Sequence, residues 1–124
     1  MIEITFNDRI LPVTSVEELS NELSQSDNIQ EFEILGTASQ GTSLCMLRSG
    51  INAFLMYLRY PGDSGFTSQG NLEVTGDASY KLANGQQDSY PLSWSIEPEE
   101  CYKAIVYFFV NEGMRPDWIK WHES

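Results

Sequence analysis

Basic side chains are scarce in this chain of 124 residues. Seven Lys and Arg residues face eighteen Asp and Glu residues, and the formal net charge at pH 7 is −11. Nucleic acids and anionic membrane surfaces bind proteins through clusters of Lys and Arg. We therefore expect the chain to bind neither nucleic acid nor membrane, and a basic protein is the natural complement of its charge.

Cysteine and histidine are also rare. Cys45 and Cys101 lie in apolar segments 56 positions apart, whereas a small secreted domain held by disulfides carries a denser set. We expect both to be buried free thiols. The only histidine, His122, has no second His or Cys at the spacing of a zinc site. The sequence predicts neither a metal centre nor a cofactor.

A long apolar run is absent as well. The longest apolar-rich stretch, Ile51 to Leu58, is far shorter than the roughly 20 residues that cross a bilayer. The first ten residues contain no basic stretch and no long apolar run, so we expect no signal peptide. Together these absences predict a soluble, cytoplasmic protein.

Length and patterning favour one α+β domain spanning residues 1–124. A hydrophobic fraction of 41% supports one core but not two cooperating domains. The stretch from Ile51 is apolar at nearly every position, which is typical of a strand covered on both faces, although a helix is the alternative there. We expect a single antiparallel sheet of about six to eight strands with two main helices packed on it. The candidate strands are residues 2–6, 10–13, 31–37, 43–48, 51–60, 72–75, 79–83, 87–95 and 117–122.

Two segments carry the apolar spacing of amphipathic helices. The first follows a cap at Thr14 or Ser15, with Glu17 or Glu18 completing a capping box. The second begins at Pro98 and is ended by Gly113, and its Glu99 is expected to pair with Lys103. The side chains expected to face the core are Val16, Leu19 and Leu23 in the first helix, and Cys101, Ala104, Ile105, Phe108 and Phe109 in the second.

Glycines mark the other expected turns and strand ends. Gly36 ends the strand that begins at Glu31, and Ser49-Gly50 forms a tight hairpin. Asn84-Gly85 is the strongest hairpin signal, because both central residues of such a turn take positive φ.

Catalytic motifs are weak. The order Gly62-Asp63-Ser64-Gly65 is also found around the nucleophile of trypsin-like proteases, but that chemistry needs a histidine upstream, and His122 lies downstream. We interpret the segment as a surface loop, and no Gly-rich phosphate loop is present. The chain is therefore not expected to be an enzyme. A small enzyme or ligand-binding domain that uses a pair of its many carboxylates is the alternative.

Acidic loops and an exposed aromatic side chain are the candidate protein-binding features. Three aspartates lie in predicted loops, and three glutamates crowd the start of the second helix. In the predicted terminal strand, Trp118 would face away from Ile119 and Trp121. An exposed aromatic beside acidic loops is typical of a binding hot spot, whereas a merely solvated acidic surface is the alternative. The candidate contact residues are Asp63, Phe66, Asp77, Asp88, Glu99 and Trp118.

The C-terminal third has a distinctive order of residues. A strand ends near Pro91, Ile96-Glu97-Pro98 precedes an apolar helix, and Gly113-Met114-Arg115-Pro116 is followed by Trp118 and Trp121. This order resembles immunity protein family one of bacterial polymorphic toxin systems. The family typically starts its helix with Ile-Pro, so the extra residue before Pro98 departs from the pattern. Upstream, Thr14 to Leu23 and the Tyr60 to Asp63 loop fit the family loosely.

The resemblance implies a cytoplasmic protein that binds and neutralises the C-terminal domain of one cognate toxin, often a nuclease or deaminase. Pro91, Gly113, Pro116 and Trp121 would be structural residues, and no contact residue carries over, because the specificity surface varies in such proteins. A cleft that holds a polyanion is expected to be basic and would attract this acidic chain. An interaction module of a larger bacterial assembly, which would self-associate or bind several partners, is a third hypothesis.

Overall fold

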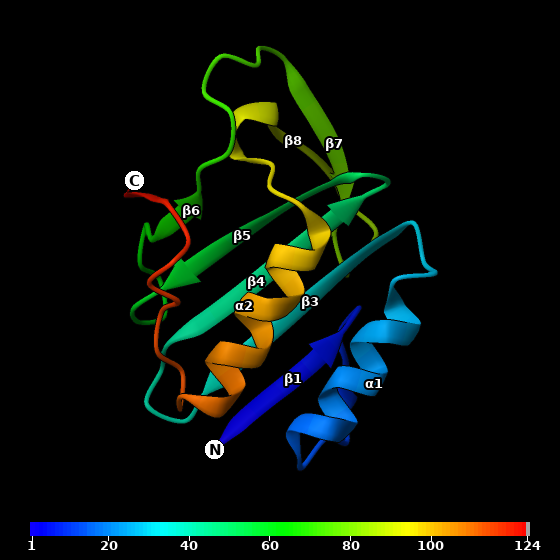
Figure 1. Ribbon diagram of the computed structural model, residues 1–124, viewed down its shortest axis with the longest axis vertical. Coiled ribbons are helices and arrows are strands. Elements are labelled where there is room, and N and C mark those ends of the chain that lie inside the picture. The colour runs from blue at the N-terminus through cyan, green and yellow to red at the C-terminus, as the bar shows by residue number, and fades with distance from the viewer. Residues whose placement is uncertain (124) are drawn as a thin grey trace.

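An antiparallel sheet crosses the whole computed structural model, which describes residues 1–123 (Figure 1). The strands are β1 (Ile2–Phe6), β2 (Arg9–Leu11), β3 (Glu31–Ala38), β4 (Ser43–Ser49), β5 (Asn52–Leu58), β6 (Phe66–Ser68), β7 (Asp77–Lys81), β8 (Gln87–Pro91) and β9 (Trp121–Glu123). Seven of them form the main sheet in the order β2-β1-β3-β4-β5-β6-β9, and each neighbouring pair is antiparallel. β7 and β8 form a separate two-stranded sheet.

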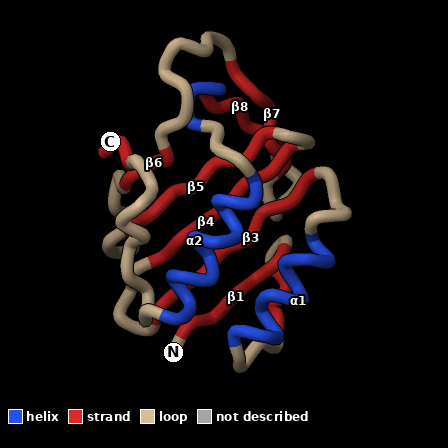
Figure 2. Tube along the Cα trace, viewed as in Figure 1, coloured by secondary structure: helices blue, strands red, loops and turns tan. Residues whose placement is uncertain are grey.

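Two helices, α1 (Val16–Ser26) and α2 (Pro98–Val110), lie on one face of the main sheet (Figure 2). The expected α+β class, with an antiparallel sheet and two helices, is confirmed. The longer helix has 13 residues, and no helix within residues 1–123 is both long and apolar enough to cross a membrane.

The first helix begins with the predicted capping box. The Ser15 side chain accepts a hydrogen bond from the Glu18 backbone N–H at 3.1 Å, and the Glu18 carboxylate accepts one from the Thr14 N–H at 2.7 Å. The hydrogen bonds from Thr14 lower the pKa of Glu18. Leu19 and Leu23 are buried as expected, but Val16 is exposed, so α1 presents a narrower apolar stripe than its sequence predicts.

The second helix begins at Pro98, as predicted, and ends in a tight hydrogen-bonded turn. The Gly113 N–H donates to the Phe108 carbonyl at 2.9 Å, and Glu112 between them has a φ of 55°. Of the five α2 side chains expected to face the core, Phe109 is half-buried and the other four are buried. Lys103 pairs with Glu100 at 3.7 Å, so the expected pair with Glu99 is wrong.

The helices and the sheet enclose the larger of two hydrophobic cores. Gly36 lies inside β3 instead of ending it. A glycine fits there because the Phe108 ring of α2 occupies the space above it. A Cβ at Gly36 would lie 3.1 Å from that ring. The largest fully buried side chains of this core are Ile4, Leu19, Phe32, Ile34, Leu44, Met46, Leu55, Ile105 and Phe108.

The β7–β8 hairpin packs on the opposite face of the sheet, where Phe54 is the central side chain. The Phe54 ring lies 5.0 Å from Tyr80, 4.9 Å from Tyr90 and 5.6 Å from Trp94, measured between ring centroids. β5 is therefore a strand covered on both faces, as its continuous apolar sequence predicts.

Both hairpin turns differ from the predictions by about a residue. Ser49 pairs with Asn52, so the first turn consists of Gly50 and Ile51. The second is a three-residue loop over 83–85 in which Gly85 alone has positive φ, and the Leu82 N–H donates to the Gln86 carbonyl.

Three predicted strand segments are wrong. Residues 72 and 73 form a turn and residues 74 and 75 irregular backbone, and residues 92–94 form a short 3₁₀ helix, η1 (Leu92–Trp94). The terminal strand begins only at Trp121, because the preceding residues turn toward α2. Trp118 there packs on Tyr107 at 5.2 Å and donates a hydrogen bond to Glu100 at 3.2 Å.

Candidate functional site

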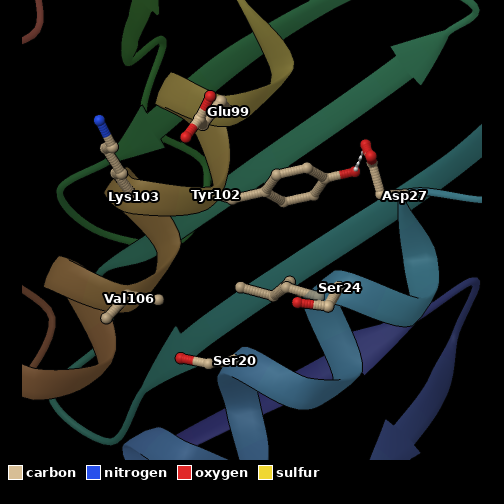
Figure 3. Close-up of a pocket in the computed structure, with 8 residues that line it drawn as sticks. Ser20, Ser24, Asp27, Glu99, Tyr102, Lys103 and Val106 are labelled. Atoms are coloured by element: carbon tan, nitrogen blue, oxygen red, sulfur yellow. Dashed lines mark hydrogen bonds between the residues drawn. The ribbon is translucent and has the colours of Figure 1, made fainter.

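A groove with a volume of about 540 Å³ separates α1 from α2 on the helix-covered face (Figure 3). Its floor is apolar, because Leu23 is buried in the larger core and Val106 packs against that core. Its rim is polar and charged. The lining residues are Ser20, Leu23, Ser24 and Asp27 on the α1 side, and Glu99, Tyr102, Lys103 and Val106 on α2.

A buried arginine organises one end of this groove. Arg48 of β4, whose side chain is 11% exposed, donates to the Gly50 carbonyl at 2.9 Å and to the Tyr102 hydroxyl at 2.8 Å, and forms an ion pair with Asp27. Tyr102 points across the groove and donates to the same Asp27 oxygen, Oδ1, at 3.2 Å (Figure 3). The end of α1 is thereby tied to α2 and to the sheet beneath both helices.

This network keeps Asp27 ionised. The hydrogen bond from Arg48 lowers the pKa of Asp27, whereas burial raises the pKa of Tyr102 to about 12. A carboxyl group that serves as general acid needs a raised pKa. The groove therefore offers an ionised carboxylate held in place by Arg48 and Tyr102, and an apolar floor, which suit binding better than proton transfer.

The structure removes Asp63 from the surface. Its side chain is 1% exposed and accepts two hydrogen bonds from the Arg59 guanidinium, at 2.8 and 3.0 Å, and one from the Arg59 backbone N–H. These bonds hold the pKa of Asp63 well below its usual range. Asp63 acts inside its own loop, so the interpretation of this segment as wholly surface-exposed is wrong for that residue.

Phe66, next to that loop, is half-buried in β6. The guanidinium groups of Arg59 and Arg115 lie 5.0 and 4.3 Å from its ring centroid. A cation is attracted to the face of an aromatic ring. The Phe66 ring, predicted to contact a partner, is therefore already covered by two arginines of this chain.

The other four candidates lie on two different faces. Asp77 and Asp88 belong to strands β7 and β8 of the hairpin, not to loops, and Asp88 accepts hydrogen bonds from Gln86 and Tyr90. On the helix-covered side, Glu99 is exposed at the groove rim, and the predicted exposure of Trp118 is confirmed at 45%. One partner surface could contact all six candidates only by wrapping around the sheet.

The acidic charge is unevenly distributed. Residues 1–47, which form β1 to α1 and most of β3 and β4, carry eight carboxylates and a single Arg, a net charge of −7. No Lys or Arg occurs between residues 10 and 47. Arg59, Arg115 and Lys120 lie at or beside the opposite sheet edge, formed by β6 and β9. The carboxylates in question are Glu3, Asp8, Glu17, Glu18, Glu22, Asp27, Glu31 and Glu33.

Metal and thiol chemistry have little support in the described part of the chain. Residues 1–123 contain no group of three or more His, Cys, Asp or Glu side chains placed to hold a metal ion. Both cysteines are free, as predicted; Cys101 is buried and Cys45 is half-buried. Burial raises the pKa of each thiol, which lowers its reactivity.

No protein-family model matches this chain, and no curated protein matches it significantly. The resemblance to the immunity family thus stays a prediction from the Tyr90–Trp121 residues. Sequence reasoning also missed the groove, whose key residues Asp27 and Tyr102 are 75 positions apart. No local signal indicated it, because α1 buries fewer apolar side chains than its sequence predicts, and a helix with few buried side chains packs loosely against its neighbour.

Proposed function

We propose that this protein is an immunity protein, which binds the active domain of one cognate bacterial toxin and blocks it without chemistry of its own. The observation that carries the proposal is the one-sided charge, with a net −7 over residues 1–47. A nuclease or nucleic-acid deaminase holds a polyanion, so its cleft is basic and is attracted to such a surface at long range.

The resemblance in the Tyr90–Trp121 segment supports the same function. In this segment Pro98 begins α2, Gly113 follows its end, and Trp121 donates a hydrogen bond to the Pro116 carbonyl at 2.8 Å. The resemblance implies that Pro91, Gly113, Pro116 and Trp121 hold the last strand and helix against the sheet, and the hydrogen bond between Trp121 and Pro116 fits that role. The proposed place of action is the cytoplasm of the cell that carries the toxin gene.

The decisive experiment is bacterial growth during expression of the toxin domain encoded beside this gene, with and without this protein. Immunity by direct binding predicts rescue together with a one-to-one complex on a sizing column. Rescue without a complex would instead indicate repair or protection of the toxin's target. Failure of rescue, with the toxin active and this protein folded, would overturn the proposal.

A matched pair of charge reversals tests the contribution of the one-sided charge. Glu17→Lys with Glu22→Lys alters α1, whereas Glu73→Lys with Asp77→Lys makes the same total change near the hairpin. We expect the α1 pair to slow association with the toxin by about tenfold at low salt and much less at high salt. Equal effects of the two pairs would show that the acidic α1 side does not steer the encounter.

A further inference from the structure

The groove between α1 and α2 is a preformed concavity whose charged rim is only partly satisfied. Within the described residues, Glu99 makes no ion pair, and Asp27 uses Oδ1 for both Arg48 and Tyr102, while Oδ2 accepts no hydrogen bond. The Asp27 side chain is nevertheless 59% exposed. Two carboxylates at one end of the groove are therefore open to an incoming cation.

The geometry of Asp27 is set before any partner arrives. Arg48 is anchored by the Gly50 carbonyl as well as by Asp27, and Tyr102 holds the same carboxylate from the other helix. A side chain that is already ordered loses little conformational entropy when it binds. Asp27 is thus a carboxylate held in place beside Arg48, unlike the exposed Glu17 of α1.

The surroundings add to the negative potential at this end. α1 has no basic residue of its own in its last turn, so Arg48 is the cation that faces the partial negative charge of its C-terminus. Glu97 and Glu99 are exposed at the start of α2. Lys103 is the one cation in the groove lining, and it is paired with Glu100 at 3.7 Å.

We propose that this groove is the docking site for a basic amphipathic segment of the toxin domain, which places an aliphatic side chain over Leu23 and Val106 and basic side chains against Asp27 and Glu99. This inference rests on the proposed immunity function. Charge complementarity selects the occupant, because a segment without cations would leave Glu99 desolvated and unpaired and Asp27 with Arg48 as its single cationic partner. An apolar stripe laid between two helices is a recurrent mode of segment recognition.

Two groove substitutions, each with a matched control, test the toxin complex. Ser24→Arg places a bulky cation in the groove lining, whereas Asn21→Arg adds the same charge to an exposed position of α1 outside it. Glu99→Lys is matched in the same way by Glu17→Lys. All four positions are exposed, so the variants should fold, and circular dichroism checks this.

We expect each groove variant to weaken toxin binding by about 30-fold or more, mainly through faster dissociation, and each control by only a few-fold. Tight toxin binding that groove and control variants weaken equally would overturn the groove as the docking site and leave the immunity function standing. Wild-type protein that fails to bind the toxin would overturn the function.

A second measurement tests the groove without the toxin. The probe is a helical peptide of Lys, Leu and Ala with its leucines on one face, compared with a scrambled peptide of the same composition. In amide NMR spectra, we expect the amphipathic peptide to shift the signals of Ser20, Ser24, Asp27, Glu99 and Val106 more than those of β7 and β8. Shifts that are absent, or equal for the two peptides, would overturn the inference whether or not the toxin binds.

Discussion

The two faces of the main sheet are covered in different ways. The helix-covered face encloses seventeen buried hydrophobic residues, whereas the hairpin-covered face encloses four, and half-buried rings such as Tyr90 and Trp94 complete it. The hairpin also covers only part of its face, since Leu35 and Leu58 on that side are half-buried. Because hydrophobic burial is the main stabilising contribution to folding, most of the stability should come from the helix-covered face.

The helix-covered face also contains the candidate binding surface. α1 contributes only Leu19 and Leu23 to the larger core among its apolar side chains, which leaves the groove open beside α2. The face that holds the fold together therefore also presents the candidate binding surface. Substitutions on the two faces should have effects of different kinds, and four variants test this, from the largest expected effect to the smallest.

Phe108→Ala should have the largest effect. Phe108 is fully buried and packs on Gly36 and against the Tyr57 ring, 6.3 Å away. We expect the free energy of unfolding to fall by about 3–5 kcal/mol, measured by urea unfolding. Phe109→Ala, at a half-buried neighbouring position, is the control and should cost clearly less. Equal losses would mean that the larger core does not dominate stability.

Phe54→Ala should mainly release the hairpin. Its ring is the common contact of Tyr80, Tyr90 and Trp94, and of these Tyr90 and Trp94 are half-buried and free to close the gap. We expect a loss of about 3 kcal/mol, at the low end for such a change. Amide hydrogen exchange should speed up in β7 and β8 before it does in β3 and β4. Uniform acceleration would show that both faces unfold as one unit.

Ser15→Ala tests how much the start of α1 contributes to the stability of the fold. The Ser15 hydroxyl accepts the hydrogen bond of the Glu18 N–H at the helix start. We expect a loss of about 1 kcal/mol in urea unfolding. Ser24→Ala in the same helix is the control and should be neutral or slightly stabilising, because alanine is the better helix former. A neutral Ser15→Ala would place the start of α1 outside the cooperative fold.

Thr67→Val should have the smallest effect, and in the opposite direction. The Thr67 hydroxyl is buried and has no hydrogen-bond partner within the described residues, on the hairpin side of β6 next to Met56. Replacing it with a methyl group removes an unsatisfied polar atom at nearly constant shape. We expect a gain of about 0.5–1 kcal/mol, whereas Thr37→Val, at an exposed position of β3, should change little. A loss at Thr67 would reveal that its hydroxyl is satisfied.

Much of the fold could be predicted where the signal is local. β1 matches its predicted bounds, and α2 begins at the predicted Pro98, because alternation and helix-start preferences depend on neighbours in the chain. The sequence predicts that Gly36 ends its strand, because the ring that requires a glycine inside β3 belongs to Phe108, 72 positions away. The local pattern also predicts a strand at Trp118, because it does not show the contacts of Trp118 with Tyr107 and Glu100.

The candidate site was less accessible to sequence reasoning. Charge and aromatic character indicated Glu99 and Trp118 as contact candidates, and the structure shows both exposed on the helix-covered side. The same reasoning chose Asp63, which Arg59 draws inside its loop. Asp27 is not among the candidates, since nothing in its neighbourhood in the chain shows that Arg48 lies beneath it. A carboxylate's role depends on the cation beside it, and that cation is often distant in the chain.

By itself the sequence determined the α+β class, the capped helices, the doubly covered β5 and the excess of negative charge, because composition, caps and periodicity are properties of neighbouring residues. Tertiary structure alone decided which face of the sheet the helices and the hairpin cover, which carboxylates pair with Arg48 and Arg59, and where a groove stays open. These features depend on contacts across tens of residues, and there the geometry of packing, not local preference, sets the distance between two side chains.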